Sequence, residues 1–131
     1  MREPAVVAAL VGVHVLVADA DAETRELLDA VFSYCGAVVT HAESANDALE
    51  MVSRCHPDVM VADVAIAGDD AELMRQLRAH GAPAAMPVVA VFSGREHSAD
   101  LLAHAGFSAQ LRKPLDPWTL CRSIASLVRK A

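Results

Sequence analysis

Hydrophobic and polar positions follow two regular patterns along the chain. Short apolar runs without a helical period occur five times, and we expect each to form a buried β-strand. Amphipathic segments, in which apolar residues return every three or four positions, follow these runs and predict α-helices. The expected strands are residues 14–18, 37–41, 59–63, 87–92 and 109–112, and the expected helices are about 22–34, 44–55, 69–80, 101–105 and 117–128.

Several residues fit the expected helix ends. Ser44 with Asp47 three positions later has the capping-box spacing, and Gly36 can end the first helix. Asp116 followed by Pro117 suits the start of the last helix, since proline is favoured in the first helical position. Five strand and helix alternations with short connections predict an α/β domain whose parallel sheet has right-handed crossovers.

Candidate functional side chains stand where the expected strands end. Asp19 and Asp21 follow the first strand, Asp63 ends the third, Ser93 follows the fourth and Lys113 follows the fifth. Because the carboxyl ends of parallel strands share one edge of the sheet, we expect these groups to converge there. Clustered carboxylates repel one another, and a divalent cation and a lysine would offset that repulsion. Asp21 also suits the N-cap of the next helix, so its role stays open.

Composition narrows the classes of partner. The chain has 131 residues, which suits one domain, and we assign 1–12 to an N-terminal tail and 13–130 to the folded domain. Its net charge is -6 and no Lys/Arg-rich stretch occurs, which argues against direct contact with nucleic acid or an anionic membrane. The cysteines, Cys35, Cys55 and Cys121, lack the spacing of a zinc site or a redox motif. We therefore expect a cytoplasmic protein with free thiols.

The ordered set of strand-end residues resembles the receiver domain of two-component response regulators, from about Val13 to Val128. That family has acids after strand one, a phosphorylated Asp after strand three, a Ser or Thr after strand four and Lys-Pro after strand five. The shorter motifs that also fit are Pro57-Asp58, Ala67-Gly68, Met86-Pro87-Val88-Val89 and Ala105-Gly106. The resemblance implies a flavodoxin-like (βα)5 fold with the strand order 2-1-3-4-5, and makes 13–130 the receiver domain.

The resemblance also implies a role for each residue. Asp63 would accept a phosphoryl group from a histidine kinase or a histidine phosphotransfer protein, and the domain would catalyse only its own phosphorylation and dephosphorylation. Lys113 would pair with the phosphoryl oxygens, and Ser93 would hydrogen-bond to them. Magnesium would be held by Asp19, Asp21, Asp63 and the backbone carbonyl of Ala65. The output would be a changed surface for an effector domain or protein, or for a homodimer through the face from the fourth strand to the fifth helix.

Three positions depart from the family pattern. Ala20 stands where receivers usually carry a second acid that binds the metal, so we expect weaker magnesium binding and slow or conditional phosphorylation. Counted without gaps from Pro87, the hydroxyl position falls on Phe92, whereas a one-residue shift places Ser93 there. Gln110 occupies the place of the aromatic residue that rotates on activation.

Two alternatives follow from these departures and from the Asp-x-Asp motif. A degenerate receiver would act as a protein-interaction module that needs no phosphorylation, which the residues at positions 20, 92 and 110 favour. An enzyme of the haloacid-dehalogenase type would have its nucleophile in Asp19-Ala20-Asp21, but Glu23 stands where that family prefers Thr or Val. The acidic pair of that family also follows its lysine, whereas Asp69-Asp70 precedes Lys113 here.

Overall fold

The computed structural model describes residues 8–94 and 97–129, so residues 1–7 of the expected tail and residues 95, 96 and 130 of the expected domain lie outside the described residues. The strands are β1 (His14–Ala18), β2 (Val38–Ala42), β3 (Val59–Asp63), β4 (Val88–Phe92) and β5 (Ala109–Arg112). The helices are α2 (Ala22–Tyr34), α3 (Ala45–Cys55), the 3-10 turn η1 (Val64–Ile66), α4 (Asp70–Ala79), α5 (Ala99–Ala105) and α6 (Pro117–Arg129).

The described strands form one parallel sheet with the order β2-β1-β3-β4-β5, which confirms the expected flavodoxin-like topology. The register pairs Ala18 with Ala62 and Asp63 with Val91. It also pairs Phe92 with Arg112 across β4 and β5. The carboxyl ends of β1, β3, β4 and β5 therefore meet at one edge of the sheet, as the sequence predicted.

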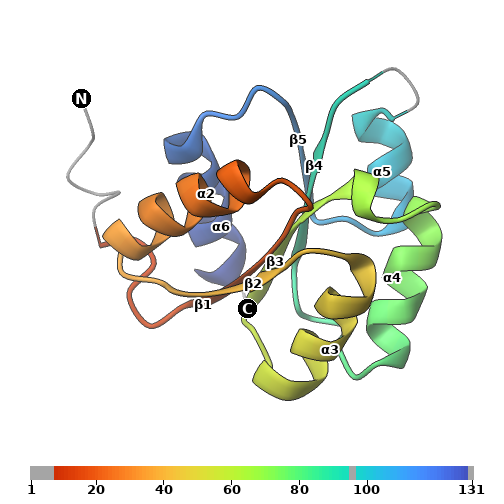
Figure 1. The fold of residues 1–131 in the computed structure, drawn as a ribbon, viewed down its shortest axis with the longest axis horizontal. Coiled ribbons are helices and arrows are strands. Elements are labelled where there is room, and N and C mark those ends of the chain that lie inside the picture. The colour runs from red at the N-terminus through yellow and green to blue at the C-terminus, as the bar shows by residue number, and fades with distance from the viewer. Residues whose placement is uncertain (1–7, 95–96, 130–131) are drawn as a thin grey trace.

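Helices cover both faces of the sheet (Figure 1). α2 and α6 pack together on one face, and α3, α4 and α5 cover the other. Alternate residues of each central strand point to opposite faces, so β3 gives Val59 and Val61 to one core and Met60 and Ala62 to the other. This burial on both faces explains why the strands read as continuous apolar runs.

Most element boundaries agree with the expected ones to within two residues, but local details differ. β2 begins and ends one residue later than predicted. The turn η1 follows β3 directly because the Asp63 carboxylate accepts the backbone N–H of Ala65, which closes a tight turn that periodicity does not indicate. Leu27, which shares the helical spacing of the core residues of α2, is 51% exposed, whereas Leu28 and Phe32 are buried.

The helix starts follow the expected chemistry. Ser44 accepts the backbone N–H of Asp47 at 3.1 Å, and Asp69 accepts that of Ala71 at 2.9 Å. Asp116 accepts the backbone N–H of Trp118 at 3.1 Å. Each cap satisfies a donor that the first turn of a helix leaves without an intrahelical partner.

Leu10, a residue of the expected tail, is fully buried in the core beneath α2 and α6. Its N–H donates to the carbonyl of Cys35 at 3.0 Å.

The helices among the described residues are each too short or too polar to cross a membrane.

Candidate functional site

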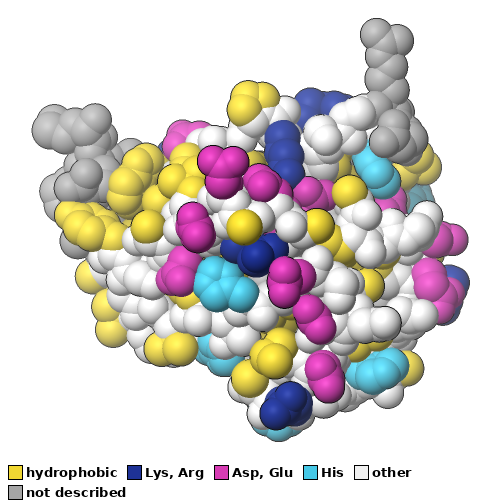
Figure 2. Space-filling view, viewed as in Figure 1, with side chains coloured by type: hydrophobic (Ala, Val, Ile, Leu, Met, Phe, Trp, Pro, Cys, Tyr) yellow, Lys and Arg dark blue, Asp and Glu magenta, His cyan; other side chains and the backbone are white. Residues whose placement is uncertain are grey.

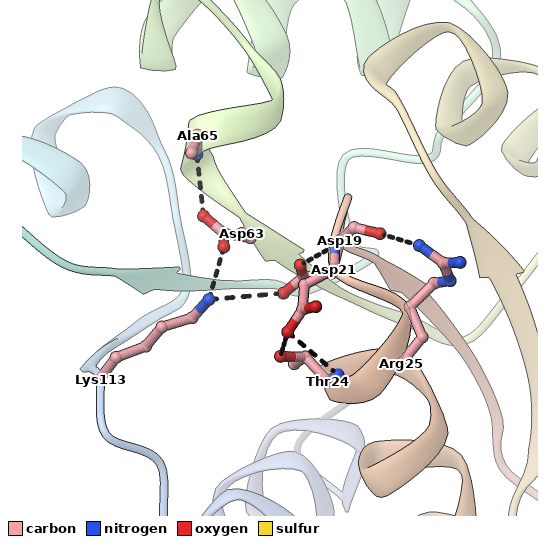
Figure 3. Close-up of polar contacts among 7 residues, drawn as sticks. All are labelled: Asp19, Asp21, Thr24, Arg25, Asp63, Ala65 and Lys113. Carbon is pink, nitrogen blue, oxygen red and sulfur yellow. Dashed lines mark hydrogen bonds and ion pairs between the residues drawn. The ribbon is translucent and has the colours of Figure 1, made fainter.

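A carboxylate and an ammonium group form the centre of the site at the carboxyl edge of the sheet. Asp63 is the last residue of β3, and Lys113 follows β5, two strands away. The Lys113 Nζ donates to Asp63 Oδ2 at 2.7 Å, and Asp63 Oδ1 accepts the N–H of Ala65 at 2.9 Å (Figure 3). Both carboxylate oxygens are thus oriented by donors, and the Asp63 side chain remains 14% exposed.

Asp19, at the end of β1, brings a second carboxylate to Lys113. Its Oδ2 lies 3.7 Å from Lys113 Nζ, and its Oδ1 accepts the N–H of Asp21 at 2.8 Å. Burial raises the pKa of Asp19, and the negative charge of Asp63 adds to that effect. Burial alone would lower the pKa of Lys113, but the hydrogen bond to Asp63 and the two carboxylate charges outweigh it and raise the pKa. Lys113 therefore remains a cation between two carboxylates.

Asp21 lies beside this group but is bonded to its own helix. Its Oδ2 accepts the Thr24 hydroxyl at 2.6 Å and the Thr24 N–H at 3.3 Å, so it caps α2. The hydrogen bond from the Thr24 hydroxyl lowers the pKa of Asp21. Of the two acids expected after β1, only Asp19 contacts Lys113 directly.

Arg25 anchors the loop that carries these acids, a role that the sequence analysis missed. Its Nη1 donates to the backbone carbonyl of Asp19 at 2.7 Å, and its Nη2 lies 3.7 Å from Glu43 in the loop before α3. In the space-filling view, basic and histidine side chains on this face lie among acidic ones (Figure 2). The spacing of Arg25 in the sequence could have indicated this role, because a residue four positions after Asp21 lies at the same end of α2 as Asp21.

The end of β4 carries the two candidates for the hydroxyl position, Phe92 and Ser93. Phe92 is 3% exposed and belongs to the core under α4 and α5. The Arg112 guanidinium lies 4.7 Å from the centre of its ring and donates to the Gly94 carbonyl at 2.9 Å. Ser93 follows the strand and is exposed, and among the described residues no hydrogen bond links it to Asp63 or Lys113. β4 thus ends in a buried aromatic ring covered by Arg112, and the exposed residue Ser93 follows it.

Gln110 in β5 is held by a local contact. Its Nε2 donates to the Phe107 carbonyl at 2.9 Å. Because an amide replaces the ring, the aromatic movement that the resemblance implies is absent from this chain.

The residues at this edge offer few carboxylate ligands for a magnesium ion. Within residues 8–94 and 97–129, no group of three or more His, Cys, Asp or Glu side chains is arranged to hold a metal ion. The carboxylates of Asp19 and Asp63, however, come from two neighbouring strands and both face the Lys113 ammonium group. Magnesium commonly takes one or two carboxylates from a protein and fills its remaining positions with water and phosphate oxygens. The donor set therefore meets the minimum for magnesium.

The burial of Asp19 gives a prediction about stability. Because its pKa in the folded protein is raised, the ionised carboxylate costs free energy on folding above that pKa, and the cost disappears as the pH falls below the ordinary value of 3.8. Asp19→Asn keeps an acceptor for the N–H of Asp21 but removes the charge. We expect this variant to be more stable than the wild type at pH 7, and the difference to disappear near pH 3.

Urea unfolding of the two proteins between pH 3 and pH 8 measures this difference. A variant less stable than the wild type at neutral pH would contradict the prediction, because the attraction between Asp19 and Lys113 would then exceed the cost of burial.

Comparison with known proteins identifies the family. The model of the response regulator receiver domain matches residues 15–125. An uncharacterized 14.6 kDa protein from the sodA1 3' region of Leptolyngbya boryana is 34% identical over 117 residues, which cover 88% of this chain and 89% of that protein. The response regulator MprA of Mycobacterium leprae is 34% identical over 120 residues, which cover 89% of this chain but only 51% of MprA.

Solved structures agree with these matches. The receiver domain of the Francisella response regulator 1452 has the same fold, with a TM-score of 0.80 at 23% identity, covering 91% of this chain and 98% of that one. Full-length FixJ from B. japonicum matches with a TM-score of 0.77 at 26% identity, covering 92% of this chain and 59% of that one. The fold, the family model and the relatives agree, and the chain belongs to the response regulator receiver domain family.

Proposed function

We propose that this receiver domain accepts a phosphoryl group on Asp63 from a histidine kinase or a histidine phosphotransfer protein. The observation that carries the proposal is the pairing of Asp63 Oδ2 with Lys113 Nζ at 2.7 Å, on a carboxylate that is oriented yet still reached by solvent. Both carboxylate oxygens are held, so the nucleophile is positioned before its substrate arrives.

Each residue of the site has its own role in the proposed phosphoryl transfer. A carboxylate oxygen of Asp63 attacks the phosphorus of the phosphohistidine, the P–N bond breaks, and the partner's imidazole leaves with the electron pair. Lys113 holds a positive charge at the transferring group, where negative charge spreads over three equatorial oxygens. Asp19 and Asp63, with the backbone carbonyl of Ala65, would hold magnesium, which supplies further neutralisation of that charge. Binding by Asp21 would require its carboxylate to leave Thr24.

Intact-mass spectrometry after incubation with acetyl phosphate and magnesium tests this proposal. We expect the gain of one phosphoryl group, dependent on magnesium and lost on standing as the acyl phosphate hydrolyses. Unchanged mass with acetyl phosphate and with phosphorylated histidine phosphotransfer proteins would contradict the proposal.

The proposed output is a change in a protein-binding surface. β4 and β5 lie at one end of the sheet order, and α6 packs in the same core cluster as these two strands. A phosphoryl group on Asp63 would change the populations of the conformations of these elements. The effector would be a further domain or a separate protein, or a second copy bound through the face from β4 to α6. The chain spans about half the length of the MprA relatives.

A degenerate receiver is the second candidate function, and the end of β4 favours it. Arg112 covers the buried ring of Phe92 and donates a hydrogen bond to the Gly94 carbonyl, so the end of β4 is held without a phosphoryl group. In this case the protein would bind its partner equally well before and after incubation with acetyl phosphate, which pull-down or calorimetry with the partner would reveal.

Ala20 gives a prediction about magnesium. The side chain is exposed beside Asp19, so a carboxylate at this position adds a ligand and one negative charge to the site. We expect Ala20→Asp to bind magnesium about tenfold more tightly, since affinity for a hard cation follows ligand charge. Isothermal titration at neutral pH measures the change.

Ala20→Asn is the matched control, because it has nearly the same size without the charge. If the two variants bind magnesium equally, charge at position 20 does not limit the site.

A further inference from the structure

Two cysteines from distant parts of the chain face each other in the core between α2 and α6. Cys35 is the residue that ends α2, and Cys121 lies in the second turn of α6. Their Sγ atoms are 3.6 Å apart, and both residues are fully buried. The chain separates them by 86 positions, so the approach results from the packing of two helices and not from a local motif.

A second contact joins the same two segments. Tyr34, the neighbour of Cys35, packs edge-on against Trp118, with ring centroids 6.0 Å apart and an angle of 76° between the planes. Trp118 lies three residues before Cys121 and thus on the same side of α6. The aromatic pair holds the end of α2 against α6, which keeps the two thiols opposite each other.

We propose that Cys35 and Cys121 are a modification site that forms an intramolecular disulfide when the protein meets a peroxide. This inference does not depend on phosphorylation of Asp63. Closing the pair requires the sulfur atoms to approach from 3.6 Å to the length of a disulfide bond, about 2 Å, a movement that side-chain rotation and small backbone shifts can supply.

The reaction balances with the peroxide as the only oxidant. One thiolate attacks an O–O bond, becomes a sulfenic acid and releases hydroxide, which takes up the thiol proton to give water. The second thiol attacks the sulfenic sulfur and releases a second water as the S–S bond forms. The two thiols lose two electrons and two protons in total, and the peroxide gains them.

Burial determines when the reaction occurs. Burial and the neighbouring Cys35 raise the pKa of Cys121, so it stays a thiol while the helices are packed. Cys35, at the end of α2, is held by the Tyr34–Trp118 contact and by the hydrogen bond from Leu10 to its carbonyl. Peroxide reaches the pair only when the contact between α2 and α6 opens transiently, and these interactions make that opening infrequent. The pair is therefore slow to react and specific in its product.

The third cysteine supplies an internal reference. Cys55 ends α3 on the opposite face of the sheet and is exposed. Cys55→Ser removes the thiol that would react first and leaves only the buried pair. This variant is the background for every measurement below.

The test treats folded Cys55→Ser protein with hydrogen peroxide, stops the reaction with catalase, and blocks remaining thiols after denaturation. We expect both thiols to disappear together, a non-reducing digest to contain a peptide linking Cys35 to Cys121, and dithiothreitol to restore both thiols. The Tm should rise by about 5 °C or more, because the bond closes a long loop in the unfolded chain.

Two results would overturn the proposal. One is persistence of both thiols through a peroxide treatment many times longer than the time that consumes Cys55 of the wild type. The other is their separate oxidation to sulfinic acid without a linked peptide. Cys121→Ala in the same background is the control for crosslinks between molecules, since a dimer through Cys35 alone would survive in it.

Discussion

Asp63→Asn is expected to abolish phosphorylation by acetyl phosphate in the presence of magnesium. The amide has the size of the carboxylate and still offers an oxygen to the N–H of Ala65, so the turn after β3 should persist. It cannot, however, act as the attacking carboxylate, because an amide oxygen is a poor nucleophile toward phosphorus. The expected result is complete loss of the mass gain at incubation times that saturate the wild type.

Circular dichroism and urea unfolding of the same variant provide the control. The substitution removes the charge that pairs with Lys113 at 2.7 Å, yet Lys113 keeps Asp19 at 3.7 Å, so the variant should fold. If a folded Asp63→Asn protein still gained a phosphoryl group, the acceptor would be another residue. Asp19 would then be the first to replace, because it is the other carboxylate on Lys113.

Lys113→Met is expected to slow phosphorylation of Asp63 by about 100- to 1,000-fold, the usual effect of removing one charge-stabilising donor from a reacting group. The ammonium group is the cation that both carboxylates face, and its raised pKa keeps it charged at neutral pH. Methionine retains most of the length and apolar character of the lysine stem but lacks the ammonium group and its charge. Initial rates of mass gain in the two proteins measure the effect.

Lys113→Arg separates charge from geometry. Arginine keeps the positive charge but presents a planar fork instead of a compact ammonium. A rate between those of the wild type and Lys113→Met would indicate that charge supplies most of the effect. If Lys113→Met reacted as fast as the wild type while remaining folded, Lys113 would have only a structural role, as an ion-pair partner of Asp63.

Much of the fold and part of the site could be predicted because they depend on local patterns. The strands are buried on both faces, so their apolar runs are visible in the sequence, and parallel pairing then places Asp19, Asp63 and Lys113 at one edge. Topology alone brings these three positions to one edge, and the direction of each side chain then decides which of them contact Lys113.

The remaining features depend on side-chain direction across long separations. Whether Asp21 turns toward Lys113 or Thr24 is decided by a hydroxyl three residues later, and both choices agree with the same sequence. The stacking of Arg112 on Phe92 requires the register between β4 and β5. The pairing of Cys35 with Cys121 requires the way in which two helices pack on the sheet. No periodicity indicates any of these contacts.

The stack of Arg112 on Phe92 restricts how this chain could change by mutation. Phe92→Thr would place a hydroxyl where the family pattern has one, but it would also empty a buried ring's volume, at a cost of about 3 kcal/mol or more. It would leave the Arg112 guanidinium without its aromatic surface. The effect of a substitution at position 92 therefore depends on the residue at position 112, and the reverse also holds, which is epistasis. Evolution toward a hydroxyl at position 92 would pass through a less stable intermediate unless position 112 and the surrounding core changed first.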